Sequence, residues 1–153
     1  MQQTIRPIVE NDLPSIKHIL DSSQLFPSEM LHEMISGYLY ADAEEFWFCF
    51  EEEGQPIGFG FCAPEKLTEG TYNLYAIAFT EETQGGGRGK QMMDYIEQLL
   101  QSKNGRVLIV ETSSLDEYQK TRAFYVKCGY VKEAVIREFY APGEDKVVFY
   151  KKL

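Results

Sequence analysis

The residues with the clearest chemical meaning form a glycine-rich turn, Gln84-Gly-Gly-Gly-Arg-Gly-Lys90. An apolar run ending at Phe79 precedes this turn, and apolar residues at helical spacing follow it from Met92 to Leu100. The first amide groups of a helix lack partners within the helix and lie at the positive end of its dipole, and glycine lets an anion approach the backbone closely. Arg88 and Lys90 add positive charge. The turn is therefore typical of a phosphate-binding site.

Two common phosphate motifs do not fit this turn. A Walker A loop ending at Gly89-Lys90 requires glycine at position 84 and Ser or Thr at position 91, and the chain has glutamine at both. The dinucleotide fingerprint fails because neither Gly85-x-Gly87 nor Gly87-x-Gly89 is followed by Gly or Ala three residues later. A flexible glycine loop that caps a helix is the alternative to an anion site.

The length and composition predict one soluble domain, residues 1–153, with 44% hydrophobic residues. No run approaches the roughly 18 apolar residues of a membrane helix, and the N-terminus lacks a signal peptide, so we expect a cytoplasmic protein. The spacing of Cys49, Cys62 and Cys128 suits buried thiols better than disulfides or a zinc site. No metal is expected.

The charge balance argues against several classes of partner. With 15 basic and 24 acidic residues the formal net charge is -9, which opposes binding to nucleic acid or to an anionic membrane. An acidic surface would attract a cationic substrate such as an amine, and it equally serves solubility.

Hydrophobic periodicity predicts which elements hold the glycine turn in place. Helices are expected after Asp12, from Pro27 to Tyr40, from the glycine turn to about Asn104, and from Tyr118 to Cys128. Strands are expected over Ile5–Val9, Phe46–Glu51, Gln55–Cys62, Tyr72–Thr80, Arg106–Thr112, Val131–Tyr140 and Lys146–Lys152. The continuous apolar run Leu74–Phe79 predicts a strand buried on both faces. The alternation of strands and helices predicts an α/β sheet with antiparallel ends.

Three segments together resemble the GNAT acetyltransferases. Gln84-x-x-Gly87-x-Gly89, after a strand reading Ile77-Ala-Phe79, resembles the pyrophosphate loop of that family. Thr121-Arg-Ala-Phe-Tyr-Val-Lys-Cys-Gly-Tyr130 is similar to the second conserved block, and Ile5-Arg-Pro7 with Asp12-Leu13 is similar to the first strand and helix. The order and spacing agree over nearly the whole chain, although the second helix region carries no motif.

The resemblance implies an α/β (α+β) fold and a donor. The expected sheet is mixed, mostly antiparallel, of about six or seven strands with a splayed parallel pair, flanked by about four helices. Acetyl-CoA, as cosubstrate, would lie in the cleft where the strand ending at Phe79 splays from the strand Arg106–Thr112. The cofactor-binding residues implied are Ile77, Ala78, Phe79, Gln84, Gly85, Gly86, Gly87, Arg88, Gly89, Lys90, Tyr118 and Lys127. Tyr118 stands where the family often has Asn, and Lys127, like Arg122, is equally compatible with a solvated helix charge.

The resemblance also implies a mechanism of direct transfer. A neutral amine attacks the thioester in a ternary complex, and a backbone N–H near Phe79 stabilises the oxyanion. Tyr125 matches the acid that protonates the leaving thiolate, whereas its spacing alone favours a packing role. Some members carry a glutamate base where this chain has Asn73. Glu111 is the best candidate to replace that base, and a salt-bridging carboxylate is the alternative.

The expected function is thus N-acetyl transfer from acetyl-CoA to a primary amine, in a small molecule or a peptide. A noncatalytic acyl-CoA-binding sensor is the second hypothesis, suggested by Asn73. A protein-interaction module using the aromatic hairpin Phe46–Phe61 is the third. Homodimers are common in similar proteins, and Arg137, Asp145 and Lys146 near the closing hairpin would shape the acceptor site or a dimer edge.

Overall fold

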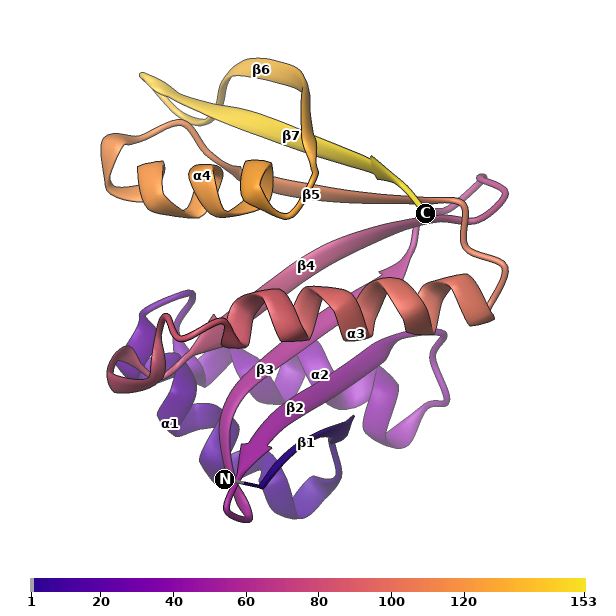
Figure 1. Ribbon diagram of the computed structural model, residues 1–153, viewed down its shortest axis with the longest axis vertical. Coiled ribbons are helices and arrows are strands. Elements are labelled where there is room, and N and C mark those ends of the chain that lie inside the picture. The colour runs from indigo at the N-terminus through magenta and orange to yellow at the C-terminus, as the bar shows by residue number, and fades with distance from the viewer. Residues whose placement is uncertain (1) are drawn as a thin grey trace. The chain divides into compact units, whose positions relative to one another are not determined.

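The computed structural model describes residues 2–153, which contain seven strands and four α-helices (Figure 1). The strands are β1 (Gln3–Pro7), β2 (Phe46–Glu52), β3 (Gln55–Pro64), β4 (Thr71–Phe79), β5 (Val107–Ser113), β6 (Val131–Ala141) and β7 (Glu144–Lys152). The helices are α1 (Leu13–Ser23), α2 (Leu31–Tyr40), α3 (Arg88–Ser102) and α4 (Gln119–Lys127). Each predicted element is present.

The strands form a seven-stranded sheet in the order β1-β2-β3-β4-β5-β7-β6. Its one parallel pair joins β4 and β5, with Thr71–Leu74 opposite Val107–Val110. Beyond this short ladder β4 continues to Phe79 and β5 to Ser113. A mixed seven-stranded sheet with one parallel pair, together with four helices, confirms the predicted fold class.

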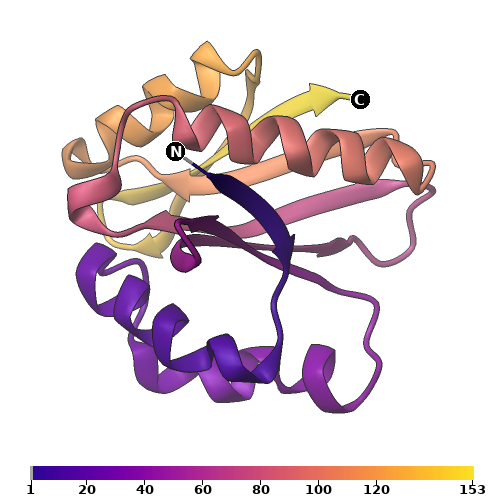
Figure 2. The same ribbon diagram turned by 60° about the horizontal axis from the view of Figure 1, so that its bottom comes forward.

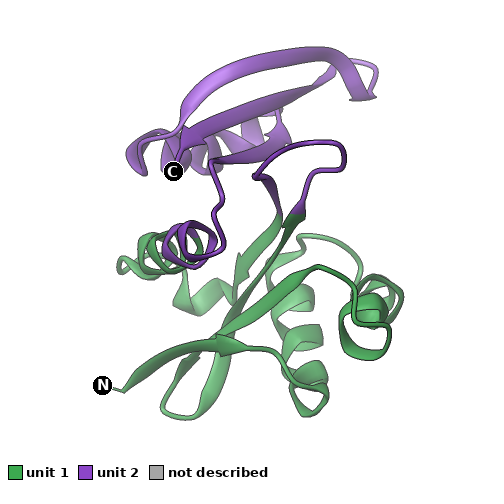
Figure 3. Cartoon of the chain, turned by 90° about the vertical axis from the view of Figure 1, so that its right-hand side faces the viewer, with its two compact units in different colours: residues 1–63, 75–96 green, residues 64–74, 97–153 purple. Residues whose placement is uncertain are grey.

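The chain divides into two compact units, coloured separately in Figure 3. The first contains the chain up to Ala63 and Tyr75–Ile96, and the second contains Pro64–Leu74 and Glu97–Leu153. Strand β4 and helix α3 each contribute residues to both units. That residues 1–153 act as one domain stays a prediction.

In the first unit, the strands carry a different layer of side chains on each face. Helices α1 and α2 lie together on one face of the strands (Figure 2), where Trp47 stacks on Phe61 at 4.1 Å between ring centroids. The neighbouring residue, Phe48, points to the other face and contacts Tyr95 of α3. Alternation along β2 therefore buries the strand from both sides.

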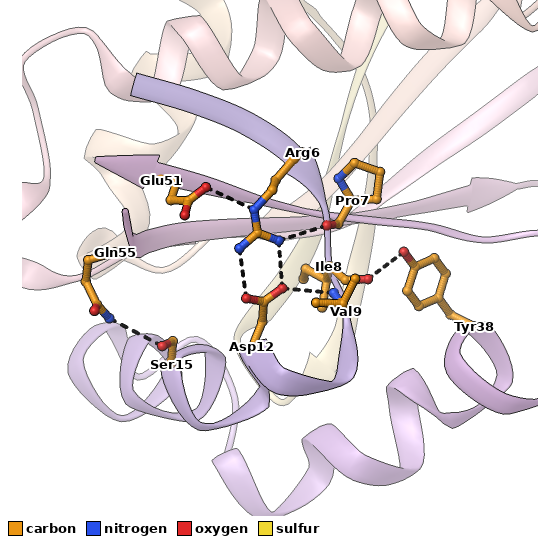
Figure 4. A network of polar contacts seen from close by, with 9 residues as sticks. All are labelled: Arg6, Pro7, Ile8, Val9, Asp12, Ser15, Tyr38, Glu51 and Gln55. Carbon is orange, nitrogen blue, oxygen red and sulfur yellow. Dashed lines mark hydrogen bonds and ion pairs between the residues drawn. The ribbon is translucent and has the colours of Figure 1, made fainter. Parts of the chain in front are cut away.

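An ionic network links β1 to the start of α1 (Figure 4). The Arg6 guanidinium donates to both Asp12 carboxylate oxygens, at 2.8 and 2.9 Å, and to Glu51 at 2.9 Å. Asp12 also accepts the Val9 N–H at 2.8 Å. The hydrogen bonds from Arg6 lower the pKa of Asp12. Charge-assisted hydrogen bonds thus join the first strand to the residue that precedes the first helix.

In the second unit, aromatic side chains and one ion pair hold α4 against the strands. Tyr125 of α4 packs against Phe149 of β7 at 5.6 Å and against Tyr130 at 6.0 Å. Glu97 accepts hydrogen bonds from the Tyr130 hydroxyl and from Lys151. The turn after α4 is thereby fixed.

Strand β1 and the burial of β4 differ from the sequence prediction. β1 runs from Gln3 to Pro7 rather than from Ile5 to Val9, because its pairing with β2 extends from Gln3 opposite Glu52 to Pro7 opposite Phe48. The run Leu74–Phe79 is not buried on both faces, since Tyr75 is 49% exposed. Tyr75 is the first residue after the ladder with β5, which ends at Leu74.

The cysteines agree with expectation. Cys49, Cys62 and Cys128 are buried, and none forms a disulfide within the described chain. Burial raises the pKa of Cys49 to about 11 and that of Cys62 to about 12. Over residues 2–153, no helix is both long and apolar enough to cross a membrane.

Candidate functional site

The glycine turn adopts a backbone conformation that glycine favours. Gly85, Gly86 and Gly87 have φ angles of 87°, 65° and 81°, and α3 begins directly afterwards at Arg88. A Cβ added at Gly85 or Gly87 would meet nothing within 4 Å. Glycine is therefore favoured here by the left-handed backbone and not by lack of space.

The amide groups of this turn remain available to a ligand. Among residues 2–153, the N–H groups of Gly85, Gly86, Gly87 and Gly89 have no hydrogen-bond acceptor. Gly85, Gly86 and Gly87 are exposed and precede a helix of 15 residues. Unpaired amides at the positive end of a long helix can bind the oxygens of a phosphate group.

The side chains of the turn are bound to the protein itself. Arg88 donates from Nε to Glu52 at 2.6 Å, from Nη2 to Glu52 at 3.1 Å, and from Nη1 to the Thr83 carbonyl at 3.0 Å. The Arg88 hydrogen bond lowers the pKa of Glu52. Lys90 contacts Asp94 at 3.1 Å. Arg88 thus fixes the turn to β2, a role that the sequence pattern did not predict.

The end of β4 leads into the turn through a buried corner. Ala78 and Phe79 are buried, whereas Ile77 is half-buried. The Gln84 side chain donates to the Phe79 carbonyl at 3.4 Å, and the Thr80 N–H donates to Ile57 at 3.0 Å. The cofactor-binding residues predicted from Ile77 to Lys90 therefore lie together in the first unit.

Tyr125 lies in the second unit with its ring enclosed and is 4% exposed. Its hydroxyl has no hydrogen-bond partner in the described part of the chain, although the ring contacts three aromatic neighbours, Phe124, Tyr130 and Phe149. Burial raises the pKa of Tyr125. The phenol therefore stays protonated at neutral pH, as a general acid must.

Glu111 lies in β5 and forms an ion pair with Lys146 of β7 at 3.0 Å. The Lys146 ammonium also lies 3.9 Å from the centre of the Phe139 ring. The Glu111 carboxylate is thus paired with a cation, as the alternative of a salt-bridging role predicted. To accept a proton, Glu111 would have to give up this ion pair.

The remaining predicted contacts differ in how firmly they are held. Tyr118 caps the start of α4 and Lys127 ends this helix, and both are exposed. Arg122 instead donates to the carbonyls of Ser113 and Leu115, at 2.7 and 2.8 Å. Arg122 therefore holds the connection between β5 and α4.

The structure adds one residue that sequence reasoning missed, Glu65. It follows β3, and its carboxylate accepts a hydrogen bond of 2.9 Å from the side-chain amide of Asn73. Asn73 is 2% exposed, and its Oδ1 atom is buried and has no hydrogen-bond partner within residues 2–153. Asn73 within an apolar strand was a signal that a polar partner exists, but no spacing rule pointed to Glu65. Glu65, Asn73, Glu111 and Tyr125 all belong to the second unit.

A family model matches most of the chain. The family model described as "Acetyltransferase (GNAT) family" matches residues 13–130. A protein of Desulfovibrio desulfuricans assigned to the GNAT family is 27% identical, with a TM-score of 0.92 and 99% coverage of both chains.

More distant structures share the fold. The ribosomal-protein-S18-alanine N-acetyltransferase of Escherichia coli is 18% identical, with a TM-score of 0.80 over 99% of this chain and 94% of the other. A spermidine/spermine N-acetyltransferase of Vibrio cholerae is 20% identical, with a TM-score of 0.78 over 99% and 92%. No curated protein matches in sequence. Since the family model covers most of the chain, including the glycine turn and Tyr125, this protein belongs to the GNAT family of acetyltransferases, enzymes that use acetyl-CoA.

Proposed function

We propose that this acetyltransferase transfers the acetyl group of acetyl-CoA to a primary amine by direct attack in a ternary complex. The observation that carries the proposal is the glycine turn, whose amides at Gly85, Gly86, Gly87 and Gly89 have no acceptor among residues 2–153. The pyrophosphate of acetyl-CoA supplies oxygens that such amides bind.

The residues present fit the donor. In this proposal the segment Gln84–Lys90 binds the pyrophosphate mainly through its backbone, because Arg88 is occupied by Glu52. The backbone of Ile77, Ala78 and Phe79 binds the pantetheine arm. Tyr118, which precedes α4, and Lys127, the last residue of α4, are both exposed and contact the far end of the cofactor.

Tyr125 is proposed to be the general acid. A thiolate leaves when the amine nitrogen has attacked the thioester carbon, and the Tyr125 hydroxyl supplies its proton. The raised pKa of Tyr125 keeps that proton in place until the thiolate forms. A backbone N–H near Phe79 stabilises the oxyanion.

The acceptor is proposed to be cationic before it reacts. The net charge of -9 favours attraction of an ammonium group. Glu111, the base predicted from the sequence, is paired with Lys146 and would act only after that ion pair opens. Two proteins of the same fold act on an alanine of ribosomal protein S18 and on spermidine or spermine. A primary amine in a peptide or a small molecule is therefore the proposed acceptor.

The test is turnover. Purified protein is incubated with acetyl-CoA and alaninamide, Nα-acetyl-lysinamide or spermidine, and free thiol and acetylated amine are measured. We expect amine-dependent thiol release that falls sharply in Tyr125→Phe. Release that is independent of every amine would contradict transfer to an amine.

A noncatalytic sensor is the second candidate, because Asn73 occupies the position of a glutamate base. It predicts tight binding of acetyl-CoA in calorimetry and no acetylated product with any amine. A homodimer stays a prediction, and light scattering of the purified protein tests it.

A further inference from the structure

Asn73 is not an acid, but its side chain binds a carboxylate. Its Nδ2 donates a hydrogen bond of 2.9 Å to Oε1 of Glu65, so the strand position holds an acid through an amide. A fully buried amide fixes the direction of the carboxylate better than an exposed one.

The backbone of Glu65 is fixed as well. Its N–H donates to the Thr71 carbonyl at 2.8 Å, and its carbonyl accepts the Thr68 hydroxyl at 2.8 Å. The same turn is tied to β5, because the Gly70 carbonyl accepts the N–H of Arg106 at 2.7 Å. Glu65 therefore occupies a preorganised position at the end of β3.

The side-chain oxygen of Asn73 is the next feature of this pair. Oδ1 of Asn73 is buried and accepts no hydrogen bond from residues 2–153. Buried acceptors in native proteins normally have a donor from the protein or from ordered water, so one without a protein donor has room for a donor from water or a ligand. Oδ1 is an acceptor next to the negative charge of the Glu65 carboxylate, which is the complement of an N–H-rich cation such as an ammonium.

The Asn73 side chain shares a sheet face with the Glu111 carboxylate. Asn73 pairs directly with Ile109, and Glu111 follows Ile109 by two residues in β5, so the side chains of Asn73 and Glu111 project to the same side. Glu111 is bound to Lys146 and would have to give up this ion pair to accept a proton. Glu65, in contrast, receives a hydrogen bond from Asn73 that leaves the charge of its carboxylate in place.

We propose that Glu65 is the general base for the acceptor amine and that Asn73 is its positioning residue. This inference rests on the proposed function. The acceptor ammonium gives one proton to the Glu65 carboxylate, and the neutral nitrogen forms a C–N bond with the thioester carbon. The C–S bond breaks, the thiolate takes a proton from Tyr125, and the nitrogen loses its second proton as the amide forms. One of these two nitrogen protons restores Tyr125, and the other leaves to solvent.

The first test uses Glu65→Gln and pH. With the panel amine of highest turnover, kcat/KM is expected to fall about 10²-fold at pH 7. The deficit shrinks as pH rises, because an amine that is already neutral needs no base. The deficit shrinks at a lower pH with an α-amine, whose pKa is about 8, than with a lysine-type amine, whose pKa is about 10.4. A purely structural role would lower turnover equally at every pH and would overturn the proposal.

The matched control is Glu69→Gln, an exposed carboxylate in the same turn, which should leave kcat/KM unchanged. Stabilisation by acetyl-CoA is measured for both variants and is expected to be retained. If the wild type turns over an amine and Glu65→Gln has the same kcat/KM, this inference is overturned and the proposed function stands. No turnover of any panel amine by the wild type overturns both.

The second test asks whether Asn73 acts through Glu65. Asn73→Ala alone is expected to lower kcat about tenfold, whereas the double variant Glu65→Gln, Asn73→Ala should be no slower than Glu65→Gln. Additive losses in the double variant would contradict a positioning role. If Asn73→Ala fails to fold, the pH response of Glu65→Gln decides alone.

Discussion

Arg88, the first residue of α3, is joined to Glu52, the last residue of β2, by two hydrogen bonds of 2.6 and 3.1 Å. Arg88 also donates to the Thr83 carbonyl, which lies just before the glycine turn. One guanidinium therefore connects a strand end, the turn and the helix. It holds the exposed amides of the turn in a fixed arrangement before any ligand binds.

Arg88→Met should weaken acetyl-CoA binding. Loss of the two-point contact frees the turn, so binding must then order it, and the dissociation constant is expected to rise about tenfold. Calorimetry measures this. Lys90→Met is the control, because its partner Asp94 is exposed, and it should change the dissociation constant much less. Equal effects of the two substitutions would show that the loss of one positive charge, and not the loss of the contact with Glu52, weakens acetyl-CoA binding.

Gly87→Ala should lower both stability and acetyl-CoA affinity. A left-handed backbone with a φ of 81° costs alanine about 1–2 kcal/mol, although the added Cβ meets nothing within 4 Å. Gly54→Ala is a matched control in the β2–β3 turn, with a φ of 79° and equally open surroundings. Denaturant unfolding should give similar losses for both. Only Gly87→Ala should weaken binding, and equal affinity of the two variants would contradict the role of the turn.

Tyr125→Phe should reduce turnover without unfolding the protein. We expect kcat/KM to fall about 10²- to 10³-fold, while stability changes little because the hydroxyl has no partner among residues 2–153. Tyr130→Phe is the contrasting variant, since it removes the hydrogen bond to Glu97 and should cost stability. Full activity of Tyr125→Phe would remove this residue from the mechanism.

Asp12→Asn should destabilise the protein in a pH-dependent way. The pKa of Asp12 is lowered in the folded state, so its contribution is present above the unfolded pKa, near 3.8, and is lost as pH falls below that value. We expect a loss of about 1–3 kcal/mol at pH 7 that shrinks below about pH 4. Thermal unfolding across this range measures it. The exposed Asp21→Asn is the control, and a deficit independent of pH would contradict the assignment to Arg6.

Much of the fold followed from local patterns. Helical spacing from Met92 to Leu100 and the glycines before it predicted a helix that begins in the turn, and α3 begins at Arg88. Both signals concern neighbours along the chain. The predicted limits of β1 were less accurate. These limits depend on the pairing of β1 with β2, which the residues of β1 alone do not encode.

The candidate site was predicted less completely than the fold. The glycine turn could be recognised because its residues are contiguous. The partners of its side chains could not, since Arg88 meets Glu52 across 36 positions, and Glu111 meets Lys146 only through the register of β5 and β7. Asn73 was interpreted as the loss of a base, but the contact with Glu65 depends on the course of the β3–β4 turn.

Calorimetry with acetyl-CoA and with S-acetylpantetheine, which lacks the pyrophosphate, tests the central claim most directly. If the amides of Gly85, Gly86, Gly87 and Gly89 hold the pyrophosphate, acetyl-CoA binds at least about 100-fold more tightly. At 100 times its dissociation constant it should also stabilise the protein by roughly 2.7 kcal/mol. Equal affinity for the two thioesters, or no binding of acetyl-CoA, would contradict the account.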